Sequence, residues 1–140
     1  MCLRVAALSG ILFLTSCDLS PDSPHGFRLP DGDAEVGRIV FEEKQCSSCH
    51  IIEALPELRE GVEPEMDVRI GGMQTRIATQ GELVSAVINP SHRIARGYRR
   101  EPYVSEGASA MRTVNENLTV AELIDLVAFL QGEYEEFPDY

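Results

Sequence analysis

The chain contains no tryptophan, and its aromatic residues are limited to 5 phenylalanines and 4 tyrosines among 140 residues. Cations are also scarce, because 12 lysines and arginines stand against 23 aspartates and glutamates and give a formal net charge of −11. Such an acidic chain repels the phosphates of nucleic acids and of anionic lipid headgroups. The sequence also lacks the run of about 18 or more apolar residues that spans a bilayer. Its 140 residues, 44% of them hydrophobic, are enough to form one domain with its own hydrophobic core.

The N-terminus has the proportions of a secretion signal. A short basic start at residues 1–4 precedes an apolar run at 5–14, and a run of about ten residues is too short to cross a membrane. The run ends in Leu-Thr-Ser before Cys17, which resembles the lipobox of bacterial lipoproteins. The resemblance implies that residues 1–16 are removed and that Cys17 is lipidated. An ordinary signal peptide, with an incidental cysteine, is the alternative.

The segment after the signal is expected to be a tether. It is rich in proline, aspartate, serine and glycine, a composition typical of a flexible linker, and its sixteen residues after Cys17 would reach roughly 20–25 Å. Asp18 resembles a sorting signal that keeps enteric lipoproteins on the periplasmic side of the inner membrane of the cell envelope. We therefore divide the chain into a signal peptide (1–16), the lipidated cysteine and tether (17–33), one domain (34–132) and an acidic tail (133–140).

The pentapeptide Cys-Ser-Ser-Cys-His at residues 46–50 carries the chemistry. This CxxCH pattern attaches c-type haem. Two thiols three residues apart on a helical turn lie on the same side of the backbone, so each can add to one vinyl group of the haem. The histidine that follows can then ligate the iron. We therefore expect thioether bonds at Cys46 and Cys49, an axial ligand at His50, and one covalent haem c as the cofactor.

A redox dithiol and a zinc site are the competing interpretations of the paired cysteines. A thioredoxin-like CxxC lies in a βαβ unit, and zinc needs further cysteines or histidines at ligand spacing. The sequence offers neither pattern. Secretion also favours haem, because attachment takes place outside the cytoplasm. Removal of Cys2 with the signal and lipidation of Cys17 would leave only Cys46 and Cys49 as free thiols.

Together these features resemble a monohaem class I cytochrome c over about residues 33–132. The segment 32–41 resembles the family's N-terminal helix, and 118–130 resembles its C-terminal helix. In the family these helices cross closely, because a glycine in the first admits an aromatic residue of the second, and Gly37 and Phe129 are the matching positions. The resemblance implies the all-α, small cytochrome c fold, with a third helix and loops wrapped round one haem. No β-strand pattern is visible in the sequence.

Two of the three helices can also be predicted without the family. Each begins with a Thr-x-x-Glu capping box before an apolar stripe. The first is expected at residues 79–89, where Pro90 ends it. The second is expected at 118–130, and Gly132 is expected to stop it.

A hydrogen bond to the axial histidine is implied by the resemblance alone. Residues 63–72 resemble the family's proline loop, in which a proline carbonyl accepts a hydrogen bond from that histidine. Pro64 is the matching position, and Pro56 is the alternative. Such a bond would orient the ring of His50 and raise its basicity.

The sixth iron ligand has four candidates. A methionine sulfur raises the reduction potential relative to a second histidine. Met111 lies shortly before the C-terminal helix, where the family's ligand loop runs, so we expect it to be the ligand, although Arg112 stands where a proline often follows. His92 is the alternative. Met66 is expected to fill the core, and Met73 to line the pocket or pack.

Four arginines fall within eight residues of this acidic chain: Arg93, Arg96, Arg99 and Arg100. They could pair with the haem propionates, for which arginine is well suited. They could instead steer the protein towards an acidic redox partner, or simply be solvated.

The function expected from these features is one-electron transport. The membrane-anchored, periplasm-facing protein would cycle its iron between Fe(II) and Fe(III), with one redox protein as donor and another as acceptor. It is not expected to be an enzyme, because no nucleophile and base are arranged for catalysis. Two alternatives remain open, a haem-based gas-binding sensor and an electron-input subunit docked to a membrane oxidoreductase.

Overall fold

The structure, a computed structural model, describes residues 27–73 and 79–135. The signal peptide, Cys17, Asp18 and the end of the acidic tail lie outside the described residues. Within the described part, the chain forms three α-helices: α1 (Ala34–Glu43), α2 (Gln80–Ile88) and α3 (Val120–Gly132). Three 3₁₀ helices lie in the connections: η1 (Cys46–Ser48), η2 (Pro56–Arg59) and η3 (Arg96–Tyr98). No helix in these two ranges has the length and hydrophobicity to span a bilayer.

The helix starts follow the local signals in the sequence. Both predicted capping boxes are confirmed, since the Thr79 and Thr119 hydroxyls each accept a hydrogen bond of 3.2 Å from the backbone of the glutamate three residues later. At the start of α1, the Asp33 carboxylate accepts bonds from two backbone N–H groups of the first turn. α3 has Gly132 as its last residue, and Glu133 is its C-cap.

The prediction of an all-α fold is wrong, because the fold is mixed α/β. In the described residues, six strands of two or three residues form three two-stranded sheets. The parallel pairs are β1 (His50–Ile52) with β2 (Val68–Ile70) and β3 (Gly72–Met73) with β6 (Tyr134–Glu135), and β4 (Val104–Ser105) is antiparallel to β5 (Ala108–Ser109). Strands this short cannot show the alternation over four to eight residues by which a strand is recognised. The two parallel pairs join segments that are distant in sequence, whereas β4 and β5 form a hairpin with two residues between them.

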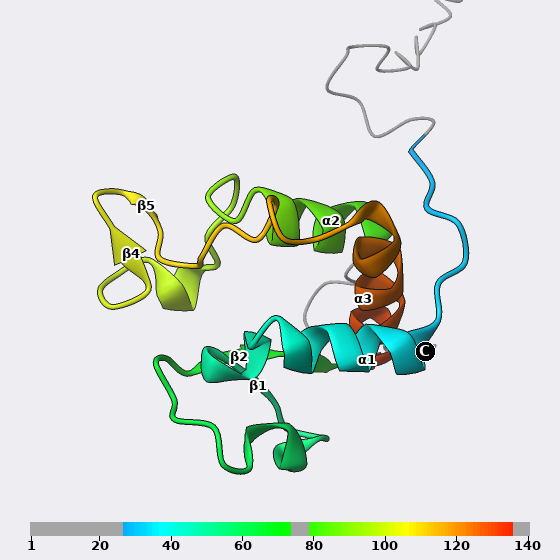
Figure 1. Ribbon diagram of the computed structural model, residues 1–140. Coiled ribbons are helices and arrows are strands. Elements are labelled where there is room, and N and C mark those ends of the chain that lie inside the picture. Colours follow the sequence, from blue (N-terminus) through cyan, green and yellow to red (C-terminus); the bar gives the residue numbers. More distant parts are fainter. Residues whose placement is uncertain (1–26, 74–78, 136–140) are drawn as a thin grey trace, which may run out of the picture.

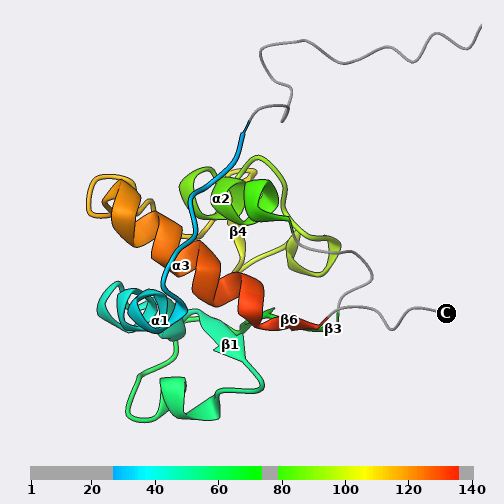
Figure 2. The ribbon, with the colours of Figure 1, turned by 90° about the vertical axis from the view of Figure 1, so that its right-hand side faces the viewer.

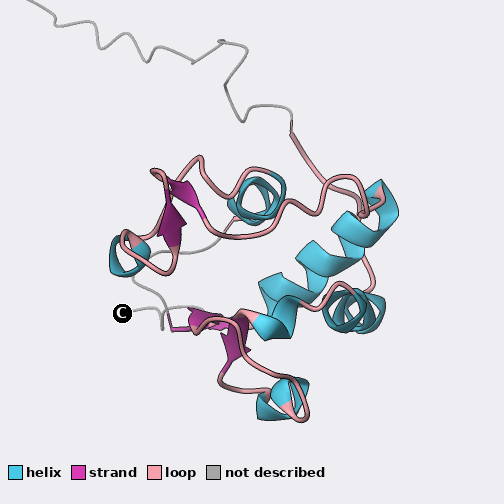
Figure 3. Ribbon diagram, turned by 60° about the vertical axis from the view of Figure 1, so that its left-hand side comes forward, coloured by secondary structure: helices cyan, strands magenta, loops and turns pink. Residues whose placement is uncertain are grey.

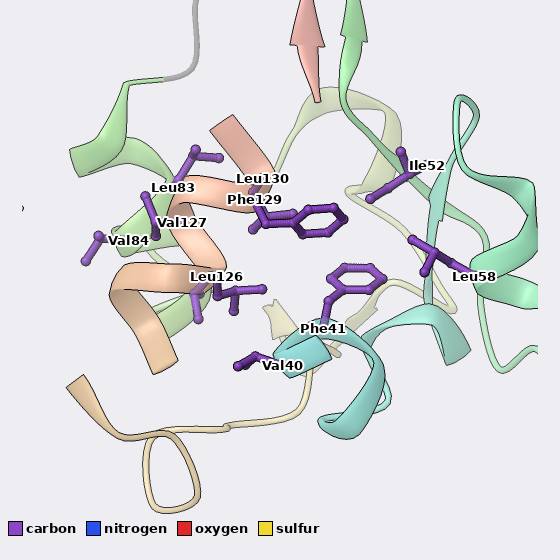
Figure 4. Packing of buried hydrophobic residues seen from close by; sticks show 11 residues of the cluster. Val40, Phe41, Ile52, Leu58, Leu83, Val84, Leu126, Val127, Phe129 and Leu130 are labelled. Atoms are coloured by element: carbon purple, nitrogen blue, oxygen red, sulfur yellow. The ribbon is translucent and has the colours of Figure 1, made fainter. Parts of the chain in front are cut away.

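The close crossing of α1 and α3 agrees with the prediction (Figure 2). A Cβ added to Gly37 would overlap the backbone carbonyl of Asp125 and lie 2.8 Å from the Cβ of Phe129, so only glycine fits at this position. Next to it, the rings of Phe41 and Phe129 meet edge to face with their centroids 5.6 Å apart (Figure 4). Such an aromatic contact adds stability beyond the area it buries.

The elements form two arms joined through α3. In the view of Figure 1, α1, β1 and β2 lie below, and α2, β4 and β5 lie above. We call residues 34–73 the lower arm and residues 79–117 the upper arm. Figure 3 shows the strand pair β4–β5 well separated from the strands of the lower arm. The core that holds the arms together contains side chains from both arms and from α3: Val40, Phe41, Ile52, Leu58, Leu83, Val84, Val87, Leu126, Val127, Phe129 and Leu130.

Candidate functional site

A cavity of about 740 Å³ lies between the two arms. This volume is within the range of sites that bind a cofactor or small molecule. Its lining is mostly apolar and comes from both arms, including Cys46, Cys49 and His50 below and Leu83 and Met111 above. A second hollow of about 100 Å³ shares several of these residues and is lined almost entirely by apolar groups, among them core residues of α1 and α3. We call this smaller hollow the recess.

We call residues 45–50 the attachment turn, after the haem attachment that their sequence predicts. Both thiols of this turn line the cavity. The turn begins at Gln45, whose left-handed backbone (φ 57°) redirects the chain after α1. Cys46 to Ser48 then form the single 3₁₀ turn η1, and β1 starts at His50. Cys46 and Cys49 are both half-buried free thiols, and both line the cavity.

The chemistry of Cys46 differs from that of a reactive redox thiol. Burial raises the pKa of the Cys46 thiol to about 11, and the positive charge of Arg112 only partly opposes this. The thiol is therefore protonated at neutral pH, whereas a reactive dithiol has a lowered pKa and forms a thiolate. A zinc site also lacks support, since no group of three or more metal-binding side chains occurs within residues 27–73 and 79–135.

His50 is half-buried and lines the cavity. Its Nδ1 atom is buried and neither accepts nor donates a hydrogen bond. Burial lowers the pKa of the imidazole, and the backbone of Val68 opposes this shift, so the ring is neutral at pH 7, the form that binds metals. The bond predicted to Pro64 is not formed in this structure, because Pro64 is exposed and Nδ1 has no partner. Buried nitrogens left without a partner are rare in proteins and call for an explanation, such as a bound group.

The candidates for the sixth ligand occupy different parts of the site. Met111 is half-buried and lines both the cavity and the recess, as His50 does. His92 is exposed and lines the cavity without reaching the recess, and its Nδ1 lies 2.7 Å from a backbone carbonyl. Met66 lines the cavity but not the recess. The side chain of Met73 lies outside the described residues. Placement at both hollows therefore favours Met111.

Positive charge surrounds the cavity. Five arginines line it, three of them from the predicted cluster: Arg69, Arg93, Arg96, Arg99 and Arg112. Arg93 forms a 3.0 Å ion pair with Glu82, and the Arg99 Nε donates a 2.9 Å bond to the Ile94 carbonyl. Arg100, the fourth member of the cluster, is exposed and is not among the described lining residues. The lining is thus suited to a ligand that carries negative groups.

Arg59 fixes the attachment turn, and the sequence analysis missed it. Its Nε donates to the Ser47 carbonyl at 2.9 Å, and its Nη2 donates to the carbonyls of Ser48 at 3.2 Å and Met66 at 2.6 Å. Its Nη1 forms a 2.6 Å ion pair with Asp67. One guanidinium therefore satisfies the backbone of the turn and of the loop beside it. These bonds join residues that are distant in sequence, so the only available signal was a cation within an acidic stretch.

Two tyrosines, also missed, connect the arms. The Tyr98 hydroxyl accepts a 3.0 Å bond from the backbone N–H of Arg69, and the Tyr103 hydroxyl lies 3.4 Å from the carbonyl of Asp67, to which it donates. Their rings meet edge to face with centroids 4.8 Å apart. The pair closes one side of the cavity, and tyrosines in an arginine-rich loop were its only sequence signal.

Comparison with known proteins adds no relative to this description. No protein-family model matches the chain, and neither the curated proteins nor the solved structures contain a match to it. The chemistry of the cavity and its lining residues therefore provides the basis for a functional conclusion.

Proposed function

We propose that this protein is a c-type cytochrome that carries single electrons between two redox proteins. The observation that supports this most strongly is the convergence of Cys46, Cys49, His50 and Met111 on one cavity. Paired thiols followed by histidine are the attachment pattern of haem c. Methionine together with histidine is an axial pair used for electron transfer.

The lining residues fit haem c as a bound group. Cys46 and Cys49 would hold the macrocycle through thioethers, and the neutral ring of His50 and the sulfur of Met111 would ligate the iron. Arginines at the cavity would pair with the propionates, which need positive partners in a partly desolvated site.

Haem, when bound, supplies a one-electron couple between Fe(II) and Fe(III). The chain's own residues set the conditions for that couple. The apolar recess, with Phe41, Leu126 and Leu130 in its wall, excludes water and lowers the local polarity, which favours the less charged state. Arg59 and the crossing of α1 with α3 keep the attachment turn fixed, so the ligand frame needs little rearrangement when an electron arrives or leaves.

We also propose that lipidation of Cys17 holds the protein in a bacterial cell envelope, on the periplasmic side, with the tether between lipid and domain. Its partners would be a protein donor and a protein acceptor, and not nucleic acid. The lipobox-like Leu-Thr-Ser-Cys, the tether composition and the net charge of −11 support these assignments. Asp18 favours the inner membrane.

The test is covalent retention of the pigment. The full chain is secreted from a host that matures c-type cytochromes, and the purified product is denatured and extracted with acidified solvent. We expect the red pigment to stay on the polypeptide and to be lost from Cys46→Ala/Cys49→Ala. Cys17→Ser is the matched control, because it should release the protein from the membrane and leave the pigment attached. Pigment that washes away from the wild type, or is absent from it, would refute the proposal.

A further inference from the structure

Arg112 links the loop that carries Met111 to the attachment turn on the other arm. Its Nη2 donates a 3.1 Å hydrogen bond to the hydroxyl of Ser48 and lies 3.5 Å from the carbonyl of Gln45. The carboxylate of Glu65 is 4.0 Å away. The residue next to the expected sulfur ligand therefore contacts the turn that carries both thiols and the axial histidine.

Ser48 is an anchored acceptor for this bond. The residue is 6% exposed, and its hydroxyl donates a 2.9 Å bond to the carbonyl of Gln45, which leaves an oxygen lone pair for Arg112. The Ser48 carbonyl accepts bonds from Arg59 and from the backbone of Glu65 at 2.8 Å. The hydroxyl therefore occupies a fixed position, and a bond to it restricts the movement of the loop.

The other bonds near Met111 do not reach the attachment turn. Its backbone N–H donates to the Ser109 hydroxyl at 3.2 Å, which is a bond within the same loop. Further along the chain, the carbonyl of Asn117 accepts a 2.5 Å bond from Lys44 of the lower arm. The bond from Arg112 to Ser48 is thus the one that joins the two arms directly beside Met111.

We propose that Arg112 is a positioning residue for the Met111 ligand, acting through its hydrogen bond to Ser48. The bond holds the ligand loop against the attachment turn and so keeps the sulfur in place at the site. This inference rests on the proposed haem function. Without the bond, the loop separates from the turn more often, and a competing ligand from solution gains access.

The experiment measures displacement of the methionine by added imidazole in the ferric holoprotein. Loss of the near-infrared sulfur-to-iron band reports the exchange, and its presence before imidazole is added shows that each variant has matured. We expect Arg112→Gln and Ser48→Ala each to raise the apparent affinity for imidazole about tenfold to a hundredfold, the range expected for loss of one hydrogen bond to a charged group. Arg100→Gln is the matched control, since it removes the same charge from the same arm away from the cavity, and it should behave as the wild type.

The double variant identifies the partner. If Arg112 acts through Ser48, Arg112→Gln adds nothing in the Ser48→Ala background. Additive effects would overturn the inference, because Arg112 would then act on another group, such as a propionate. Wild-type affinity in Ser48→Ala would also overturn it, and this small substitution can be measured even if Arg112→Gln does not mature. A wild type that lacks covalent haem would refute the proposed function instead, so the two failures are distinguishable.

Discussion

The lower and upper arms meet the same cavity but are held in different ways. The lower arm crosses α3 without space for a Cβ at Gly37, and Arg59 and the β1–β2 pair fix its attachment turn. The loop of the upper arm is tied across the cavity by side-chain hydrogen bonds that involve Tyr98, Tyr103 and Arg112. The thiols proposed for haem attachment thus lie on the more constrained arm, and the proposed sulfur ligand lies on the less constrained one.

The arms also differ in charge. The stretch 53–67 of the lower arm carries six acidic residues: Glu53, Glu57, Glu60, Glu63, Glu65 and Asp67. The upper arm carries the arginine cluster at 93–100. These two stretches therefore carry opposite charge, which would orient an approaching partner and make association rates fall with salt.

Adding a side chain at Gly37, where α1 crosses α3, should have the largest effect on stability. In Gly37→Ala, the added Cβ overlaps the backbone of Asp125, so the helices must separate, at a cost of about 3 kcal/mol. Urea unfolding followed by circular dichroism measures this loss. Gly97→Ala is the control, because a Cβ there meets open space. Equal stability of Gly37→Ala and wild type would show that the crossing is not tightly packed.

Removing the proposed sulfur ligand, Met111, should change the spectrum and the reduction potential of the bound haem without unfolding the domain. We expect Met111→Ala to abolish the near-infrared sulfur-to-iron band and to lower the reduction potential, because a thioether ligand raises that potential. His92→Ala, an exposed residue of the same cavity, should leave both unchanged. The reverse pattern would make His92 the ligand.

Removing the donors of Arg59 should loosen the attachment turn. Arg59→Met keeps most of the apolar stem but removes the donor to the carbonyl of the buried Ser47 and one of the donors to the carbonyl of Ser48, which costs about 2 kcal/mol. The loss is measured by urea unfolding against Arg100→Met, an exposed arginine outside the described lining of the cavity. A stability unchanged from wild type would mean that the turn is held by the chain's own backbone.

The smallest effect is expected at the salt bridge between the lower arm and α3. The side-chain contact with Lys44, followed by bonds from Thr119, lowers the pKa of Glu122 to about 2 from its ordinary value of 4.5. The folded state therefore favours the carboxylate. The stability it contributes is present above pH 4.5 and is lost as the pH falls towards 2. Glu122→Gln should flatten the pH dependence of the unfolding free energy in this window, and an unchanged slope would contradict the assignment.

Sequence reasoning succeeded where the signal was local. The capping boxes at Thr79 and Thr119 need residues only three apart, whereas the close approach at Gly37 was predicted from the family resemblance. The parallel strand pairs, the bonds of Arg59 to the attachment turn and the contact of Arg112 with Ser48 join residues more than ten positions apart, so no short window of the sequence contains both partners. The all-α prediction failed for this reason.

The most direct test of the central claim is the absorption spectrum of the secreted, purified protein in its oxidised and reduced forms, extended into the near-infrared. We expect a low-spin c-type haem in both forms, a sulfur-to-iron band in the oxidised form, and no rapid binding of carbon monoxide to the reduced form. Rapid carbon monoxide binding would indicate an open iron site and a gas-binding role. A protein without haem absorbance would contradict the function proposed for Cys46, Cys49 and His50.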